Sequence, residues 1–406
     1  MSLMPYDMRN GLTPRRLTIA MWDYSWLKGH YPGGSFENYG QAVDELVERN
    51  FNTVRIDCYP LTIGLLNSEE EEVTILGEPL ANWGVCDVDR KHSIVRELVE
   101  FMQACKDRGV YVILSTWNDR CKEHPDLHQH YASDRAAFRV AWGRTLDILG
   151  SRGLLEHVLY VDLDQEFPYF SPYADEMNKL AVNGNTSQAS GGNLADNMEA
   201  AVNQQGGTNK LIWTSEQLVY VDELHKEMLQ HFQRKYPYLR FTYSLTSFWK
   251  EVRTAGNRSY DVLELHMFMQ SALQSERLES RIGFNDIVKD RGDHDYSDYQ
   301  RRIDDAFRVM RPMFMQEMHN RLSFAMEWSA EIGAPVTTSE AWGPWWHMDH
   351  RHLSWSWLRD WCTECNELAG RYGLWGTTPW NYAHPYWENW RDVSWYKEVN
   401  GVFLRS

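Results

Sequence analysis

Two glutamates each stand just after a short apolar segment of the chain. Glu340 follows residues 336–339 and lies in a tryptophan-rich stretch at residues 340–346, and Glu166 follows residues 158–163. A carboxylate at the end of a buried strand costs desolvation energy unless it is paired or used in chemistry. Two such groups suit the cleavage of a glycosidic bond, in which one carboxylic acid protonates the leaving oxygen and one carboxylate attacks or activates water. We therefore take Glu340 and Glu166 as the candidate catalytic pair.

Further polar and aromatic residues stand at the ends of the other apolar segments. A buried arginine would keep a nucleophilic carboxylate ionised by pairing with it. Apolar surroundings and a nearby negative charge would raise the pKa of the acid. Flat tryptophan and tyrosine rings would stack on the faces of sugar rings. The candidate substrate contacts are Trp22, Arg55, Trp117, Asn118, Gln165, His266, Trp342, Trp345 and Trp380.

Each candidate also has a purely structural interpretation. Glu340 and Arg55 would equally suit a structural ion pair. His266 would suit a core histidine with its ring nitrogens hydrogen-bonded, and Asn118 would suit a turn. Glu166 would suit a solvated loop carboxylate, and Asp164 rivals it as the acid. Tryptophan is large and often half-buried, so we expect some tryptophans near the site to line a groove and the others to pack in the core.

Eight short apolar segments alternate with amphipathic helical patterns along the chain. Several are near-continuous runs of Val, Ile and Leu, as expected of strands buried on both faces. The predicted strands are residues 17–22, 53–56, 110–116, 158–163, 241–245, 262–266, 336–339 and 374–378. The predicted helices include residues 39–49, 93–108, 135–149, 222–234, 299–332, with a kink at Pro312, and 353–370.

The connections that follow the predicted strands are much longer than those that precede them. The long connections are residues 57–92, 164–214, 267–298 and 381–397. Eight βα units with elaborated loops at the carboxyl ends of the strands predict an α/β fold, a (β/α)8 TIM barrel with its site on that face. A doubly wound sheet is the alternative. No compositional break marks a linker, so we expect residues 1–406 to form a single domain with a mobile loop around residues 183–207.

The charge of the chain argues against nucleic acid and membranes as partners. The net charge is −16, whereas both of those partners require clustered lysine and arginine. No apolar run is long enough for a transmembrane helix, and residues 1–16 lack the apolar core of a signal peptide. We therefore expect a cytoplasmic location, with a removed signal peptide as the alternative, and make no prediction of the oligomeric state.

Neither the cysteines nor the histidines predict a metal or another cofactor. Cys362 and Cys365 have no second pair of matching spacing, so free thiols are expected. Residues 347–352 contain histidines and an aspartate, but their spacing fits no helical ligand pair. Residues 293–298 lack the glycine and the distal glutamate of a calcium-binding loop.

Four short motifs resemble those of the cellulase-type glycoside hydrolases, a large clan of retaining (β/α)8 enzymes with catalytic glutamates after strands four and seven. The motifs are residues 52–56, 264–266, 338–343 and 378–381. The resemblance implies that Glu340 is the nucleophile, that Arg55 contacts it and that His266 holds the site. It also implies that Glu166 is the acid/base and that Trp380 lies under the cleaved sugar.

Two residues depart from the pattern of that family. Gln165 precedes Glu166 where the family usually has Asn, which contacts the sugar 2-hydroxyl, and Phe268 stands where it commonly has Tyr. The sequence thus predicts a retaining hydrolase of β-linked oligosaccharides or polysaccharides, with carboxyl groups about 5–5.5 Å apart. The departures motivate an alternative, a non-catalytic or weakly catalytic carbohydrate-binding protein on the same barrel. A metal-dependent barrel hydrolase or isomerase is a third interpretation.

Overall fold

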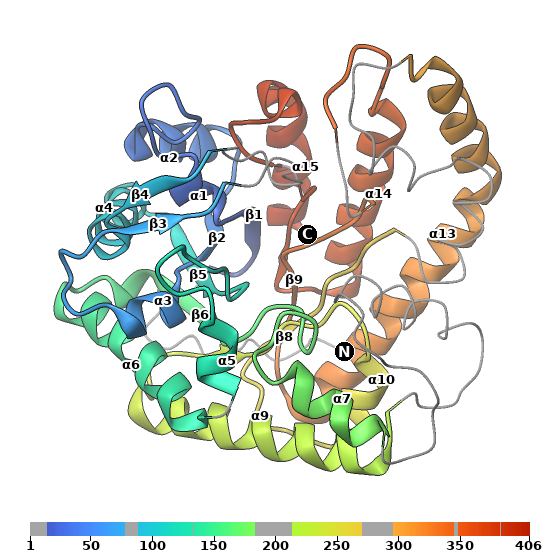
Figure 1. The fold of residues 1–406 in the computed structure, drawn as a ribbon. Helices are drawn as coiled ribbons and strands as arrows, with labels where there is room; N and C mark the ends of the chain where they lie inside the picture. The colour runs from blue at the N-terminus through green and yellow to red at the C-terminus, as the bar shows by residue number, and fades with distance from the viewer. Residues whose placement is uncertain are drawn as a thin grey trace.

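Parallel strands form the centre of the computed structural model (Figure 1). The structure describes residues 14–77, 88–132, 134–182, 213–269, 295–344, 348–381 and 383–406. The strands are β1 (Leu17–Asp23), β2 (Thr53–Asp57), β5 (Tyr111–Ser115), β6 (Val158–Asp162), β7 (Phe241–Thr242), β8 (Leu263–Glu264), β9 (Val336–Thr338) and β10 (Gly376–Thr377). They lie in the order β7-β6-β5-β2-β1-β10-β9-β8, and each neighbouring pair is parallel. Each predicted strand is therefore present.

The two ends of this strand order meet and close the barrel. Leu245, just after β7, bridges in parallel to Leu265, just after β8. The amide of Leu245 donates to the carbonyl of Glu264 over 3.0 Å, and the amide of His266 donates to the carbonyl of Leu245 over 2.8 Å. The sheet is therefore a (β/α)8 barrel, as predicted, and the doubly wound alternative is wrong.

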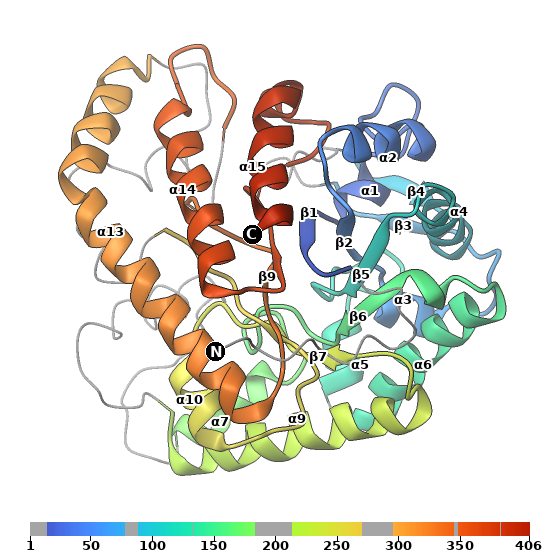
Figure 2. The ribbon, with the colours of Figure 1, turned by 180° about the vertical axis from the view of Figure 1, so that it is seen from behind.

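Helices surround the barrel on its outer face (Figures 1 and 2). The longer ones are α2 (Tyr39–Glu48), α4 (Ile94–Asp107), α6 (Arg135–Ser151), α7 (Ala174–Val182), α9 (Ser215–Lys235), α13 (Ser297–Ile332), α14 (Ser356–Tyr372) and α15 (Val393–Arg405). The shorter ones are α1 (Ser25–Lys28), α3 (Pro60–Leu65), α5 (Leu127–Ala132) and α10 (Trp249–Ala255), with 3-10 turns at Leu155–His157 and Glu388–Arg391.

The helices differ from the sequence prediction mainly at their ends. α9 begins at Ser215 rather than at residue 222 because Thr214 caps it, accepting from the amide of Gln217 while the Gln217 side chain accepts from the amide of Thr214. α13 continues as one helix through Pro312. The prediction also missed a small antiparallel pair in the connection after β2, formed by β3 (Val73–Ile75) and β4 (Arg90–His92).

The side chains of β1 point alternately into the barrel and into the layer between the barrel and its helices. Leu17 and Ile19 lie in a buried cluster with residues of β5 and β6 inside the barrel. Ala20 and Trp22 lie in the larger core that includes the surrounding helices. Because successive side chains of a strand point to opposite faces, Asp23 shares the inner face with Leu17 and Ile19. This parity decides which strand-end residues reach the mouth of the barrel.

Within the described ranges, no helix is long and apolar enough to cross a membrane. The loop predicted around residues 183–207 lies outside those ranges, as does Trp345.

Candidate active site

Polar side chains from five of the barrel strands meet at the carboxyl end of the barrel. Arg55 lies within β2, and Asp23 is the last residue of β1. Glu166, His266 and Glu340 follow β6, β8 and β9 within a few residues. In a (β/α)8 barrel the carboxyl ends of all strands open on the same face, so segments far apart in the sequence supply one cluster.

Glu340 is held by two donors on one of its oxygens. Arg55 Nη2 lies 2.5 Å from Glu340 Oε1, and Gln165 Nε2 donates to the same oxygen over 2.7 Å. Glu340 is only 1% exposed. Charge-assisted hydrogen bonds of this kind stabilise the ionised form of a buried carboxylate, so the contacts favour Glu340 as an anion.

Arg55 is the fully buried centre of the cluster. Its Nε and Nη2 donate to the two oxygens of Asp23, each over 2.8 Å, in a paired geometry that only arginine offers. Its Nη1 lies 2.5 Å from Ser339 Oγ and 3.0 Å from His266 Nε2. The guanidinium thus contacts two carboxylates, a hydroxyl and an imidazole at once.

The contacts of His266 determine which ring nitrogen carries its proton. Arg55 can only donate, so His266 Nε2 must accept, and the proton therefore lies on Nδ1. Nδ1 lies 2.8 Å from Glu166 Oε1 and 3.6 Å from Glu340 Oε1. Burial lowers the pKa of His266, with Arg55 acting in the same direction and Glu340 opposing it. The histidine is thus a neutral donor to Glu166.

Glu166 is in a different electrostatic position from Glu340. Burial raises the pKa of Glu166 to about 8, although Arg55 and a hydrogen bond from the Thr246 hydroxyl act to lower it. Its backbone adopts a left-handed conformation with φ of 50°, and its amide contacts Ser244 Oγ at 3.0 Å. Non-glycine residues rarely adopt this conformation, and such residues cluster at functional sites.

The two glutamates are suited to opposite protonation states. Burial raises the pKa of Glu340 as well, to about 7, although Arg55 acts to lower it. Glu340 contacts the arginine directly, whereas Glu166 receives its hydrogen bond from the neutral His266. The geometry therefore favours a protonated Glu166 beside an ionised Glu340.

Glu166, His266 and Glu340 each offer an atom that lies within 4.8 Å of the others. Such a triad has the composition of a metal site. However, Nδ1 of His266 carries the proton directed at Glu166, and the cationic Arg55 already occupies Glu340 Oε1. A metal would have to displace that proton and lie close to the guanidinium, so this donor set is poorly suited to a cation.

Comparison with known families agrees with this geometry. Residues 19–404 match the cellulase-like family, which is described as sugar-binding. The chain belongs to the cellulase-like family. No match was found among curated protein sequences. The family expected from the sequence motifs is thus confirmed.

Solved structures show the same fold. A Parabacteroides distasonis protein, provisionally described as a glycoside hydrolase, shares 23% identity over 96% of this chain and 94% of its own, with a TM-score of 0.74. A tri-modular endo-β-1,4-glucanase of glycoside hydrolase family 5, subfamily 4, from Bacillus licheniformis shares 12% identity with a TM-score of 0.50. That match covers 96% of this chain and 60% of the glucanase. This member of the cellulase-like family therefore has a glycoside hydrolase fold.

Both departures from the motifs of the cellulase-like family lie at the cluster. Gln165 reaches Glu340 with its amide nitrogen, so the longer side chain still contacts that carboxylate. Phe268 is half-buried, its ring centroid lies 6.5 Å from that of His266, and its carbonyl accepts from Arg321 Nη1 over 2.9 Å. Its ring has no hydroxyl to donate, so Arg55 and Gln165 supply the hydrogen bonds to Glu340 described above.

Among the predicted aromatic contacts that lie in the described ranges, Trp117 reaches the cluster. Its Nε1 donates to Asp23 Oδ2 and its amide donates to Asp57 Oδ2, each over 2.9 Å. The indole is half-buried and packs edge-to-face on Phe170, with ring centroids 4.6 Å apart. Trp117 and Phe170 thus form an aromatic wall next to the Asp23–Arg55 pair.

The structure places Trp22, a predicted substrate contact, in the core. Trp22 is fully buried on the outer face of β1, where it packs against Phe36 and Phe101. Its Nε1 donates to the carbonyl of Ala383 over 3.1 Å. The residue that reaches the site from the end of β1 is its neighbour Asp23, as the alternation of the strand requires.

Trp342 and Trp380 are also fully buried. The Nε1 of Trp342 donates to the carbonyl of Thr378 over 3.0 Å. Trp380 lies between Trp355 and Trp395, each with ring centroids 6.4 Å from its own. Both rings pack between the barrel and its helices, so the structure gives them a core position rather than an exposed sugar-binding face.

Asn118 belongs to the support of the site rather than to its opening. Its Nδ2 donates to Asp164 Oδ1 and to the carbonyl of Phe170, each over 2.9 Å. Burial raises the pKa of Asp164 to about 7. Asp164, the rival acid, is thus a buried partner of the turn, and Glu166 is the acidic residue that lies next to Glu340.

Three residues outside the predicted catalytic pair and substrate contacts complete the cluster, namely Asp23, Ser339 and Glu264. Asp23 pairs with Arg55, and Ser339 links Arg55 to Glu264. The sequence contains a signal for Glu264. It lies two residues before His266 at the end of one strand, so the two side chains share the inner face of that strand.

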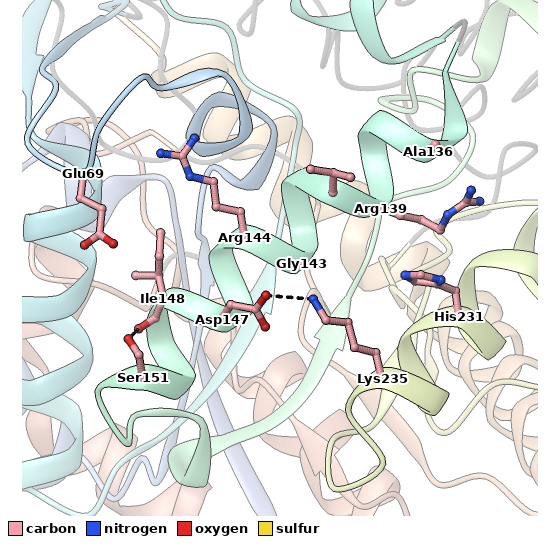
Figure 3. A pocket seen from close by; sticks show the side chains of 11 residues that line it. Glu69, Ala136, Arg139, Gly143, Arg144, Asp147, Ile148, Ser151, His231 and Lys235 are labelled. Atoms are coloured by element: carbon pink, nitrogen blue, oxygen red, sulfur yellow. Dashed lines mark hydrogen bonds and ion pairs between the residues drawn. The ribbon is translucent and has the colours of Figure 1, made fainter.

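A separate surface hollow of about 840 Å³ lies between α6 and α9 (Figure 3). Lys235 Nζ and Asp147 Oδ2 pair there at 2.9 Å, and Arg139 pairs with Glu227. Lys235, Asp147 and Arg139 thus have charged partners on the outside of the barrel, and we assign no chemistry to the hollow.

Proposed function

We propose that this protein is a retaining glycoside hydrolase in which Glu340 is the nucleophile and Glu166 is the acid/base. The observation that carries the proposal is that oxygens of the two carboxyl groups lie within 4.8 Å of each other at the carboxyl end of the barrel. Retaining enzymes place these groups about 5–5.5 Å apart, and inverting enzymes about 6.5–9.5 Å apart to admit a water. The short spacing supports direct attack by a carboxylate.

In the first step, Glu340 attacks the anomeric carbon while Glu166 protonates the departing oxygen. The donors from Arg55 and Gln165 both use Glu340 Oε1, which leaves Oε2 as the attacking atom. His266 donates to Glu166 Oε1, which leaves the proton on Oε2 of Glu166. The bond from the anomeric carbon to the leaving oxygen breaks as the bond to Glu340 forms.

In the second step, water hydrolyses the ester on Glu340. Formation of the ester removes the negative charge beside Glu166, so the pKa of Glu166 falls and it acts as the base. It takes a proton from the water, whose oxygen attacks the anomeric carbon and releases Glu340 as a carboxylate. Two inversions at that carbon give net retention.

The proposed substrate is a β-linked oligosaccharide or polysaccharide. The similarity in fold to the Bacillus licheniformis endo-β-1,4-glucanase supports a β-linked glycan. The half-buried rings of Trp117 and Phe170 offer an apolar surface of the kind that sugar faces bind.

A second candidate is a carbohydrate-binding protein without turnover. The absence of a hydroxyl at Phe268 and the 1% exposure of Glu340 favour it. This candidate predicts that sugars bind and that no glycoside is cleaved.

A panel of aryl β-glycosides separates these candidates. We expect wild-type protein to release the aryl group from at least one glycoside and the Glu340→Gln variant to lose that turnover by at least about 1,000-fold. Glu367→Gln on α14, which makes the same change at a residue whose side chain is 45% exposed, is the matched control and keeps full turnover. Sugar binding without turnover of any glycoside would contradict the hydrolase proposal, and loss of turnover with a chelator would favour a metal-dependent enzyme.

A further inference from the structure

Glu264 is a fully buried carboxylate inside the barrel, two residues before His266. Its Oε1 accepts from the amide and from the hydroxyl of Ser339, each over 2.7 Å. Its Oε2 accepts from the Thr337 hydroxyl over 2.6 Å and from the Tyr160 hydroxyl. These four hydrogen bonds are all donated to Glu264, an arrangement that suits a carboxylate and that an amide side chain cannot reproduce.

Ser339 connects Glu264 to the arginine that contacts Glu340. A hydroxyl has a single proton, and Ser339 directs it to Glu264, so its oxygen accepts from Arg55 Nη1 at 2.5 Å. Nε2 of His266 lies 3.0 Å from the same Nη1 and 3.8 Å from Glu264 Oε1. A continuous chain of contacts therefore runs from Glu264 through Ser339 and Arg55 to Glu340.

We propose that Glu264 is a positioning residue for glycosidic cleavage, which acts through Ser339 to fix the Arg55 guanidinium against Glu340. This inference rests on the proposed hydrolase function. With Glu264 in place, Ser339 presents its lone pairs to Arg55 and the arginine is held from both sides, by Ser339 and by Asp23. Without it, the Ser339 hydroxyl is free to rotate, and Arg55 loses one of the groups that set its direction.

The same chain ties Glu264 to the protonation of Glu166. The titratable and charged groups that face Glu264 are Tyr160 and Asp162 on β6, Arg55 on β2 and His266 next to β8. Those that face Glu166 are Arg55, Asp23, Glu340, His266 and Tyr169. Arg55 is the cation common to both sets. When the charge of Glu264 is removed, less of the positive charge of Arg55 is compensated. The electrostatic potential at Glu166 then becomes more positive, so the pKa of Glu166 falls.

Three variants test this chain at different points. Glu264→Gln removes the charge and sets an amide NH2 against donors. Ser339→Ala cuts the contact to Arg55 but keeps the backbone amide that donates to Glu264. Tyr160→Phe is the matched control, because it removes one donor to Oε2 of Glu264, whereas Ser339 contacts Oε1. We expect kcat to fall about 10- to 100-fold in Glu264→Gln and Ser339→Ala, with KM changed by no more than about threefold. In the control, we expect kcat to fall by less than about threefold.

A double-mutant cycle tests whether the two residues act as one unit. We expect the Glu264→Gln/Ser339→Ala double variant to lose no more kcat than the worse single variant, because both changes interrupt the same chain. Additive losses, or equal losses in Ser339→Ala and Tyr160→Phe, would show a merely structural role and overturn the proposal.

Infrared titration of the Glu166 carboxyl on the free protein gives a readout that needs no turnover. The carboxyl band is assigned by its loss in Glu166→Gln. We expect its midpoint to shift to lower pH in Glu264→Gln, and to stay unchanged in Tyr160→Phe. An unchanged midpoint in Glu264→Gln overturns the positioning role even if the wild-type protein turns over glycosides. A shifted midpoint in a protein that cleaves no glycoside would support the electrostatic link and overturn the hydrolase function instead.

Discussion

Arg55 Nη2 lies 2.5 Å from Glu340 Oε1, and the same guanidinium pairs with both oxygens of Asp23. One fully buried cation on β2 thus connects the last residue of β1 with Glu340, two residues after β9. The pairing determines which of the two central glutamates is ionised, because His266, the partner of Glu166, is held neutral by the same arginine.

Replacing Arg55 by lysine should reduce turnover strongly. A lysine offers one point charge and cannot make the paired contact with Asp23 while also reaching Glu340. We expect kcat of Arg55→Lys to fall about 100- to 1,000-fold, measured with the best aryl glycoside. The kcat of Asp23→Asn, which leaves the arginine in place, should fall less than that of Arg55→Lys. Near-wild-type turnover in Arg55→Lys would show that the arginine does not hold the nucleophile.

The pH profile should have an alkaline limb set by Glu166. Its pKa is raised to about 8, so the acid form needed to protonate the leaving group persists below that pH and is lost as the pH rises through it. We expect kcat/KM to fall about tenfold per pH unit above about 8. A 2,4-dinitrophenyl glycoside, whose leaving group needs no proton, serves as the control and should show a much flatter limb. Identical limbs for both substrates would contradict the assignment of Glu166.

Gln165 should contribute to the reaction through its amide nitrogen. It donates to Glu340 over 2.7 Å, and its length is what lets it do so from the position before Glu166. We expect kcat to fall about 10- to 100-fold in Gln165→Ala. The kcat of Gln165→Glu should fall further, because this side chain has equal size but no donor and adds a second negative charge. If Gln165→Glu retains more activity than Gln165→Ala, the hydrogen bond is not the relevant contribution.

Two tryptophans should respond differently to the same substitution. Trp117→Phe removes the indole donor to Asp23 beside the site, so kcat/KM should fall about tenfold, with little change in stability. Trp22→Phe leaves a gap in the core under the helices, so the free energy of unfolding should fall by about 1–3 kcal/mol with KM unchanged. Urea unfolding and steady-state kinetics on both variants check this. The reverse pattern would place Trp22, not Trp117, at the site.

The barrel could be predicted from two signals. Several of its strands are near-continuous runs of Val, Ile and Leu, and long connections follow the strands. The shortest strands, β7, β8 and β10, were still found, since their apolar segments extend beyond the paired residues. The start of α9 was missed because the prediction weighed apolar periodicity rather than the cap formed by Thr214 and Gln217. The β3–β4 pair has only three residues a strand, and β4 contains no apolar residue.

The pair of glutamates and their arginine could also be predicted, because charged residues at the ends of apolar strands are rare and expensive. Which tryptophans lie at the site could not be predicted, because an indole ring suits a buried core and a sugar-binding surface equally well. Trp22 and Asp23 are adjacent in sequence, and only the parity of β1 decides that the aspartate faces inward. The role of Ser339 depends on three-dimensional contacts with Arg55 and Glu264 that no spacing in the sequence shows.

Covalent trapping with a 2,4-dinitrophenyl 2-deoxy-2-fluoro-β-glycoside, with the sugar taken from the best substrate of the aryl glycoside panel, is the most direct test of the central claim. The fluorine slows hydrolysis of the intermediate more than its formation, so a retaining enzyme accumulates the ester. Mass spectrometry of the digested protein should then show one added glycosyl group, on the peptide that contains Glu340. A label on Glu166, or rapid turnover of the panel substrate with no label on any carboxylate, would contradict the account.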